Sequence, residues 1–167
     1  LLFQRVGVDT QPFDPGNCLI FSSGRLNATP WPTASRYHVT FKSPATGAYG
    51  YANAGGHMGP ELRNAGYDAI VVTGKAPEPV ILQIAQRSIR ILPAGELWGA
   101  DTYHVEETLK ASGGGRVAAI GPAGEHLVHI AAIINDGGRA AARSGPGAVM
   151  GSKNLKALHV NAGQKSP

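Results

Sequence analysis

The chain has 167 residues, about one domain, and 43% of them are hydrophobic, which is enough for a core and excludes an intrinsically disordered chain. Its 15 Lys and Arg against 11 Asp and Glu give a formal charge of +4, which suits a small anionic ligand but is too weak and scattered for a nucleic-acid-binding domain. The single cysteine, Cys18, excludes an intrachain disulfide and any self-contained cysteine-ligated zinc or iron–sulfur site.

The apolar runs are short, and none approaches the ~20 residues of a membrane span. No basic N-terminal region is followed by an apolar stretch and a small-residue cleavage site. With one cysteine, this pattern predicts a cytoplasmic protein that does not enter a membrane. The chain begins with Leu1 rather than Met, so we expect a fragment or a processed piece of a longer protein.

Short runs rich in β-formers recur along the chain, and Gly, Pro, Asn or Asp separates most of them. The predicted strands are Cys18–Phe21, Tyr37–Lys42, Ala69–Val72, Val80–Ile84, Ser88–Leu92, Val117–Ile120, His129–Ile134 and Ala157–Val160. Residues Pro79–Leu92 are predicted to form a hairpin with Ala85, Gln86 and Arg87 at its tip.

Two helices are predicted among these strands. Pro60 to Gly66 has a proline where a helix starts and a glycine where one ends, and Asp101 can cap a helix in which Val105 and Leu109 are i, i+4 partners. Strands outnumber helices and do not alternate strictly with them, which favours an α+β fold over a doubly wound sheet. No linker divides the chain, and residues 1–167 are predicted to form a single domain.

The segment from Ala140 to Lys156 has the composition of an anion-binding loop. Its glycines and serines let the main chain approach a ligand, and Arg143, Lys153 and Lys156 could neutralise phosphate charge. It lacks the spacing of a Walker A loop. Arg139 and Arg143 are four residues apart, so on a helical turn they would project from one face, either toward a ligand or into solvent.

Two further segments could bind an anion. In the first, Asn53, Ala54, Gly55 and Gly56 precede the predicted helix, whose free N–H groups could bind an anion, although an ordinary strand-to-helix turn explains the glycines equally. In the second, Arg36 precedes a strand and could grip a phosphate with both arms of its guanidinium, or could lie in solvent beside a turn.

The other ionisable residues form no recognisable catalytic pattern. The six histidines lack the spacing of a metal site, and we expect them on the surface or in packing roles. Glu106 and Glu107 are neighbours whose side chains diverge on a helix, so general acid–base catalysis by this pair is not expected. Cys18 is expected to be buried as a small hydrophobic residue. No pair of a nucleophile and a base can be identified in the sequence.

Taken together, the segments resemble the N-terminal domain of the tungsten-containing aldehyde ferredoxin oxidoreductase family. The resemblance covers nearly the whole chain and rests on ten segments in order: Leu19–Gly24, Ser35–Tyr37, Lys42–Gly47, Asn53–Gly56, Gly59–Leu62, Ala65–Asp68, Leu97–Gly99, Ile120–Glu125, Asn135–Arg139 and Gly145–Lys156.

This resemblance implies a β-rich domain of two sheets with a few short helices, on which a bis-pyranopterin tungsten or molybdenum cofactor sits with a magnesium ion between the pterin phosphates. It places Arg36 and the Asn53–Gly56 loop, including Ala54 and Gly55, at one cofactor edge. It places Arg143, Ser144 and Gly145 at the other edge. Main-chain carbonyls near Asn53 and Ser144 are then candidate magnesium ligands, because magnesium prefers oxygen.

The chain also departs from the family. Family members begin some tens of residues earlier and continue through two helical domains, which carry the cysteines of a [4Fe–4S] cluster that Cys18 cannot replace. Met58 and Ala45 stand where a larger aromatic residue and a leucine are expected, and Ser144 where glycine or alanine is commoner.

The resemblance therefore implies a cofactor-binding part of an enzyme that oxidises aldehydes to carboxylic acids and passes electrons through the cluster to ferredoxin. The remaining domains or a partner subunit would carry the cluster, and we expect no catalysis by the 167 residues alone. The oligomeric state stays open, a homodimer being one option. The alternative is a non-catalytic pterin- or phosphate-binding module, or an assembly partner, derived from the same domain.

Overall fold

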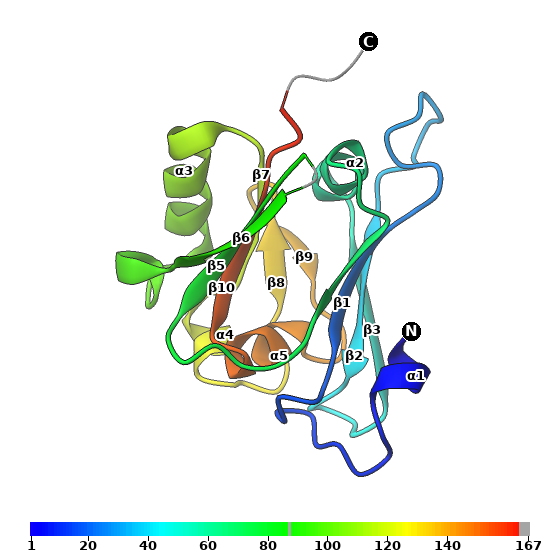
Figure 1. The fold of residues 1–167 in the computed structure, drawn as a ribbon, viewed down its shortest axis with the longest axis vertical. Coiled ribbons are helices and arrows are strands. Elements are labelled where there is room, and N and C mark those ends of the chain that lie inside the picture. Colours follow the sequence, from blue (N-terminus) through cyan, green and yellow to red (C-terminus); the bar gives the residue numbers. More distant parts are fainter. Residues whose placement is uncertain (87, 164–167) are drawn as a thin grey trace.

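The computed structural model describes residues 1–86 and 88–163, and it contains two β-sheets facing each other across the core (Figure 1). The four-stranded sheet is antiparallel and has the order β3 (Tyr49–Ala54), β2 (Tyr37–Lys42), β1 (Leu19–Ser23) and β4 (Ala69–Val72). The six-stranded sheet has the order β6 (Ser88–Pro93), β5 (Val80–Ala85), β10 (Leu155–Val160), β7 (Arg116–Ala119), β8 (Ile133–Asn135) and β9 (Arg139–Ala141). Its one parallel pair is β5 with β10.

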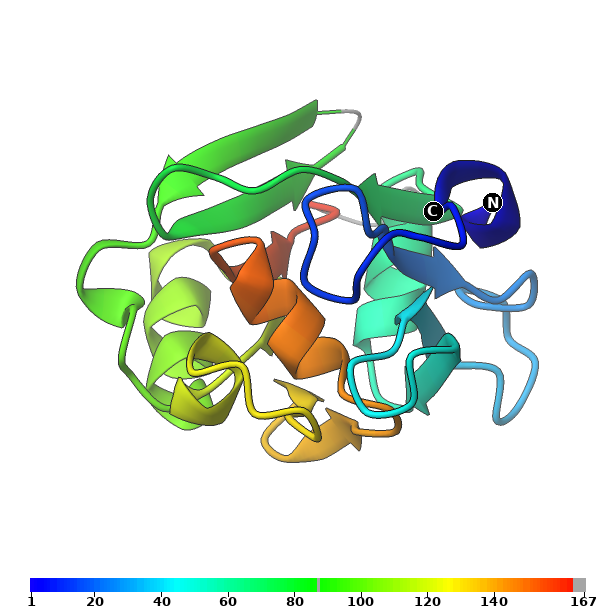
Figure 2. The ribbon, with the colours of Figure 1, turned by 90° about the horizontal axis from the view of Figure 1, so that it is seen from below.

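The helices close the two ends of the core and cover parts of both outer faces. They are α1 (Leu2–Arg5), α2 (Met58–Asn64), α3 (Thr102–Gly113), α4 (Pro122–Glu125) and α5 (Pro146–Ser152), with a 3₁₀ turn at Gly95–Leu97. In Figure 1, α2 lies at the top of the space between the sheets and α5 at the bottom, while α3 packs on the outside of the six-stranded sheet. Seen from below, α5 runs through the middle of the molecule (Figure 2).

Alternating side chains of the four-stranded sheet build the main core. Tyr37, Val39 and Phe41 of β2 are fully buried, whereas the residues between them are partly exposed. Such period-2 burial is what one covered face of an antiparallel sheet produces. These side chains meet α2, α5 and the inner face of β10, so the positions of both ends of β2 are fixed by the core.

The predicted α+β, two-sheet fold is confirmed. Strands β2 and β4 have the predicted bounds, and Asp101 caps α3 by accepting a hydrogen bond of 2.8 Å from the His104 N–H. The predicted hairpin is β5 and β6, but Arg87 at its tip lies outside the described residues.

Three predictions of local structure were wrong. The strand expected at His129–Ile134 begins only at Ile133, because the residues before it form the connection that follows α4. Residues 146–152, expected to be loop, form α5, whose seven residues are all buried. Arg139 lies in a strand rather than on a helical turn, so it does not share a helix face with Arg143.

Candidate functional site

The first part of the site is the point where β2 begins and β3 ends. The two strands are antiparallel and Tyr37 pairs with Ala54, so Arg36, just before β2, lies beside Gly55, just after β3. The Arg36 Nε–H donates a hydrogen bond of 2.7 Å to the Asn53 side-chain oxygen. A pairing between strands therefore brings together Arg36 and the Asn53–Gly56 loop, as the sequence had suggested.

The edge strand β9 adds a second arginine to this point. A methyl group at Gly55 would lie 3.5 Å from the Arg139 Nη1 and 3.6 Å from the Arg36 Nη1. Both guanidinium groups thus lie at contact distance from the position that a side chain on residue 55 would occupy.

Neither arginine is neutralised within the described residues. The four ion pairs found there join Arg63 to Asp68, Lys110 to Glu106, Arg116 to Asp136, and Lys156 to Glu125. Both Arg36 and Arg139 are exposed, and Arg36 bonds to a neutral amide. Two guanidinium groups without ion-pair partners beside the same glycine have the donors and the charge to bind a phosphate-like anion.

The neighbouring Gly56 is a structural glycine. Its φ of 98° lies in the region that favours glycine, and a Cβ there would overlap the Asp136 carboxylate. Asp136 Oδ2 accepts a hydrogen bond of 2.6 Å from the His57 N–H. Gly55 therefore leaves room for a ligand, whereas the space at Gly56 is filled by the protein. Ala54 points into the core and is also structural.

Two buried side chains, those of Tyr37 and Asn135, connect the core to the Asn53–Gly56 loop through hydrogen bonds. The Tyr37 hydroxyl donates a hydrogen bond of 3.1 Å to Asn135 Oδ1, and Asn135 Nδ2 donates one of 3.0 Å to the Gly55 carbonyl. Burial, and secondarily the charge of Asp136, raise the pKa of Tyr37 well above its ordinary value, so the hydroxyl keeps the proton that it donates. No separate role at the site was expected for Asn135 or Asp136, because nothing in the local sequence indicates their partners 79 to 98 residues away.

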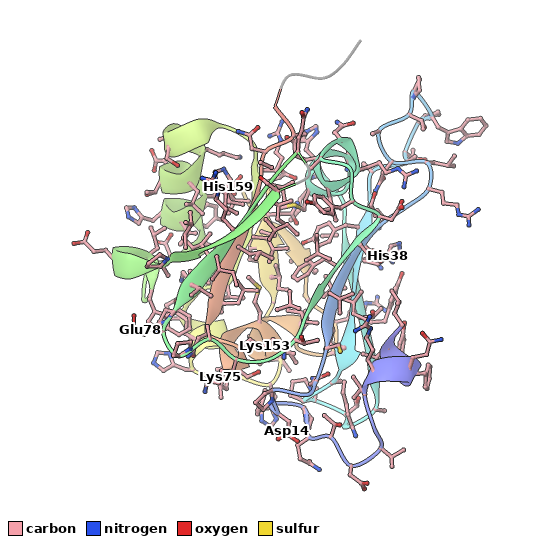
Figure 3. All side chains as sticks on the ribbon, in the orientation of Figure 1. Asp14, His38, Lys75, Glu78, Lys153 and His159 are labelled. Carbon is pink, nitrogen blue, oxygen red and sulfur yellow. The ribbon has the colours of Figure 1, made fainter. Side chains whose placement is uncertain are left out.

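The outer face of β3 continues the polar surface away from the arginines. Asn53 Nδ2 donates 3.1 Å to the Tyr51 hydroxyl, and the Tyr51 ring lies against His38, with centroids 5.3 Å apart. His38 can be located on β2 in Figure 3. Arg36, Asn53, Tyr51 and His38 thus form one connected row of side chains on this sheet face.

Arg143, Ser144 and Gly145 lie elsewhere. The Ser144 carbonyl accepts a hydrogen bond of 2.8 Å from Ser43 Oγ, just beyond the other end of β2. Gly145 has a φ of 80°, and a Cβ there would overlap the His129 carbonyl. These glycine and serine positions serve close packing of the protein against itself.

The two predicted magnesium ligands, the main-chain carbonyls of Asn53 and Ser144, belong to segments near opposite ends of β2. Asn53 pairs with His38, which is five residues from Ser43 along β2, or about 16 Å at the rise of an extended strand. Two ligands of one magnesium ion lie within about 4 Å of each other. A single ion bound by both carbonyls stays a prediction, and the estimated separation along β2 is the observation that counts against it.

The lysines of the Ala140–Lys156 segment are structural. Lys153 donates to the carbonyls of Pro15 at 3.3 Å and Gly74 at 3.1 Å, and burial lowers its pKa (Figure 3). Lys156 is fully buried in β10 and pairs with Glu125.

Two wider searches found nothing in the described part of the chain. Residues 1–86 and 88–163 contain no cluster of three or more His, Cys, Asp or Glu side chains that could hold a metal ion. Within the same residues, every helix is too short or too polar to cross a membrane.

Fold and site together define a two-sheet α+β domain with two exposed arginines beside Gly55 at one end of its four-stranded sheet. Comparison with known proteins gives the family: residues 1–162 match the family described as "Aldehyde ferredoxin oxidoreductase, N-terminal domain", and the chain belongs to it. The expected family is thereby confirmed.

Individual relatives agree. The chain is 48% identical to the tungsten-containing aldehyde ferredoxin oxidoreductase of Pyrococcus furiosus, over 100% of this chain and 28% of that protein. The protein of the same name from Pyrococcus abyssi is also 48% identical, over 95% of this chain and 27% of its own length.

A solved structure shares the fold. It is described as the active-site complex BamBC of benzoyl coenzyme A reductase with 1,5-dienoyl-CoA, and it matches with a TM-score of 0.94 and 40% identity over 98% of this chain and 25% of that chain. The chain thus spans about a quarter of the length of each of these relatives.

Proposed function

We propose that this domain binds the phosphate groups of a bis-pyranopterin cofactor, with tungsten or molybdenum, in an oxidoreductase of the aldehyde:ferredoxin type. The observation that carries the proposal is that the guanidinium groups of Arg36 and Arg139, neither of which forms an ion pair within the described residues, both lie beside Gly55. The relatives named for their tungsten support the cofactor class.

The residues present fit a phosphate-bearing group. Arg36 and Arg139 are exposed and would grip phosphate oxygens with charge-assisted hydrogen bonds beside Gly55. Asn53 holds Arg36 in place through its side-chain oxygen, which leaves its main-chain carbonyl as a candidate magnesium ligand.

When bound, the metal with its dithiolene ligands supplies the oxidation–reduction chemistry, and the protein supplies binding and orientation. The described residues offer no nucleophile–base pair at the arginine site, so this domain acts by holding phosphate charge in a fixed place. The same proposal includes the oxidation of an aldehyde and the transfer of electrons through a [4Fe–4S] cluster to ferredoxin. It also includes a cytoplasmic location and assembly with further domains, a partner subunit or a second copy of the chain. The substrate stays open, because the relatives include a benzoyl coenzyme A reductase as well as aldehyde oxidoreductases.

The test is cofactor content. The chain and its Arg36→Ala and Arg139→Ala variants would be produced in a host that makes the cofactor, and tungsten, molybdenum and released pterin would be measured. Arg5→Ala is the matched control, because Arg5 is an exposed arginine on α1. We expect metal and pterin in the wild type and the control and their loss in both site variants. An empty wild type would overturn the cofactor proposal, and pterin without any activity in the assembled protein would favour the non-catalytic module.

A further inference from the structure

The turn between β8 and β9 lies directly behind the arginine site, and its Asp136 contacts three separate segments. The side chain is 9% exposed and the residue has a φ of 47°. Oδ2 accepts hydrogen bonds from the His57 N–H at 2.6 Å and from Asn135 Nδ2 at 2.8 Å. One carboxylate oxygen thus ties the start of α2 to the end of β8.

This carboxylate also packs beside the base of Arg139. A Cβ at Gly56 would overlap Asp136 Oδ2 and would lie 2.8 Å from Arg139 Cδ. Asp136 and the Arg139 side chain therefore share the space that Gly56 leaves empty. Moving the carboxylate would free both the backbone at Gly56 and the stem of Arg139.

The other side of Asp136 faces a third arginine. Its Oδ1 is buried and accepts no hydrogen bond within the described residues, and the Arg116 Nη1 lies 3.7 Å away. Helix α3 also holds the turn, because Glu106 Oε2 accepts a hydrogen bond of 2.9 Å from the Gly137 N–H. The negative charge of Asp136 is thus directed at Arg116, and the guanidinium groups of Arg36 and Arg139 remain free for a ligand.

We propose that Asp136 is a positioning residue of the anion site: its Oδ2 fixes the Gly55–His57 backbone against the β8–β9 turn, so that Arg36 and Arg139 are both held beside Gly55. This inference rests on the proposed function, because it assumes that the arginines bind phosphate. Asp136 acts through the arginines and does not itself touch the ligand.

The test compares Asp136→Ala with Asp136→Asn by titrating the full 167-residue chain with inorganic pyrophosphate in a calorimeter. An asparagine amide oxygen can still accept from His57 and Asn135, whereas alanine cannot. We expect Asp136→Ala to bind at least about tenfold more weakly and Asp136→Asn to stay within about threefold of wild type. Asn17→Ala is the matched control, because Asn17 is a buried side chain with three backbone hydrogen bonds near the other end of β2.

A second readout follows the loop without any ligand. Amide hydrogen exchange at His57 should be faster in Asp136→Ala and unchanged in Asp136→Asn and in Asn17→Ala. Equal weakening in Asp136→Ala and Asn17→Ala would mean general destabilisation and would overturn the proposal, as would wild-type binding by Asp136→Ala. Equal weakening in both Asp136 variants would assign the effect to the charge and overturn the hydrogen-bond role. A wild type that does not bind pyrophosphate would instead overturn the anion site, and the role given to Asp136 would fall with it.

Discussion

The two ends of β2 have similar glycine- and arginine-containing segments nearby but use them differently. At the Arg36 end, a methyl group at Gly55 would make only ordinary contacts with the guanidinium groups of Arg139 and Arg36. At the Ser43 end, Gly145 is pressed against the His129 carbonyl and the Ser144 carbonyl is already bonded. Glycine in a sequence indicates close approach of a backbone to something, but only the fold decides whether that partner is a ligand or the protein itself.

The largest effect is expected at the closed end. Gly145→Ala combines a φ of 80° with overlap of a backbone carbonyl, so we expect a loss of about 3 kcal/mol or more in the free energy of unfolding. Urea denaturation of the purified chain would measure it. Wild-type stability in this variant would show that the closed end is looser than described.

The second prediction contrasts the two arginines that the sequence had grouped together. Arg139→Ala should weaken pyrophosphate binding by about 1.5 to 3 kcal/mol, roughly 10- to 150-fold, because it removes a charged hydrogen-bond donor. Arg143→Ala, beyond the end of β9, should change the binding constant by less than about threefold. Calorimetric titration of both variants measures the difference, and a larger effect at Arg143 would reverse the assignment.

A smaller effect is expected at Tyr37, beneath the site. Tyr37→Phe leaves Asn135 Oδ1 without its donor and should cost about 1 kcal/mol at neutral pH. Because the pKa of Tyr37 is raised in the folded state, the folded wild-type protein keeps the Tyr37 hydroxyl proton, which the unfolded chain loses above pH 10.0. That contribution to stability is complete below pH 10.0 and falls above it by about 1.4 kcal/mol per pH unit.

The phenylalanine variant lacks this loss. The lowered pKa of buried Lys153 acts in the opposite direction in both proteins, so the difference between them at each pH isolates Tyr37. Urea denaturation from pH 8 to 11 checks the prediction, and parallel pH profiles for the two proteins would contradict it.

The smallest effect on stability is expected at Gly55. Its φ does not require glycine and a methyl group would make only ordinary contacts, so Gly55→Ala should change the free energy of unfolding by less than about 1 kcal/mol. The same methyl group would lie beside both arginines and should weaken pyrophosphate binding severalfold. Strong destabilisation without a change in binding would show that Gly55 is structural, like Gly56.

Local patterns predicted the elements whose burial alternates clearly. Strand β2 alternates large buried and partly exposed residues, and the α3 cap needs only Asp101 and its own backbone, so both could be predicted from the sequence. Strand β3 was missed because its buried positions are Gly50, Ala52 and Ala54, which give almost no hydrophobic signal.

The site depended on longer-range information. Helix α5 contains two glycines with poor helix propensity and forms because all its residues are buried. The place of Arg139 beside Gly55 depends on the β8–β9 turn reaching the end of β3, where Asn135 contacts Gly55, 80 positions away in the sequence. Sequence spacing favoured the Arg139–Arg143 pair, and only strand pairing separates the two and brings Arg139 to Arg36.

The central claim is that the anion site lies at the Arg36 end of β2. A titration of the isotope-labelled chain with inorganic pyrophosphate, followed by nuclear magnetic resonance, observes both ends in one experiment. The account predicts saturable shifts of the Gly55 and His57 amides and of the Arg36 and Arg139 side-chain Nε signals, with the Ser144 and Gly145 amides unmoved. Shifts confined to Ser144 and Gly145 would contradict it.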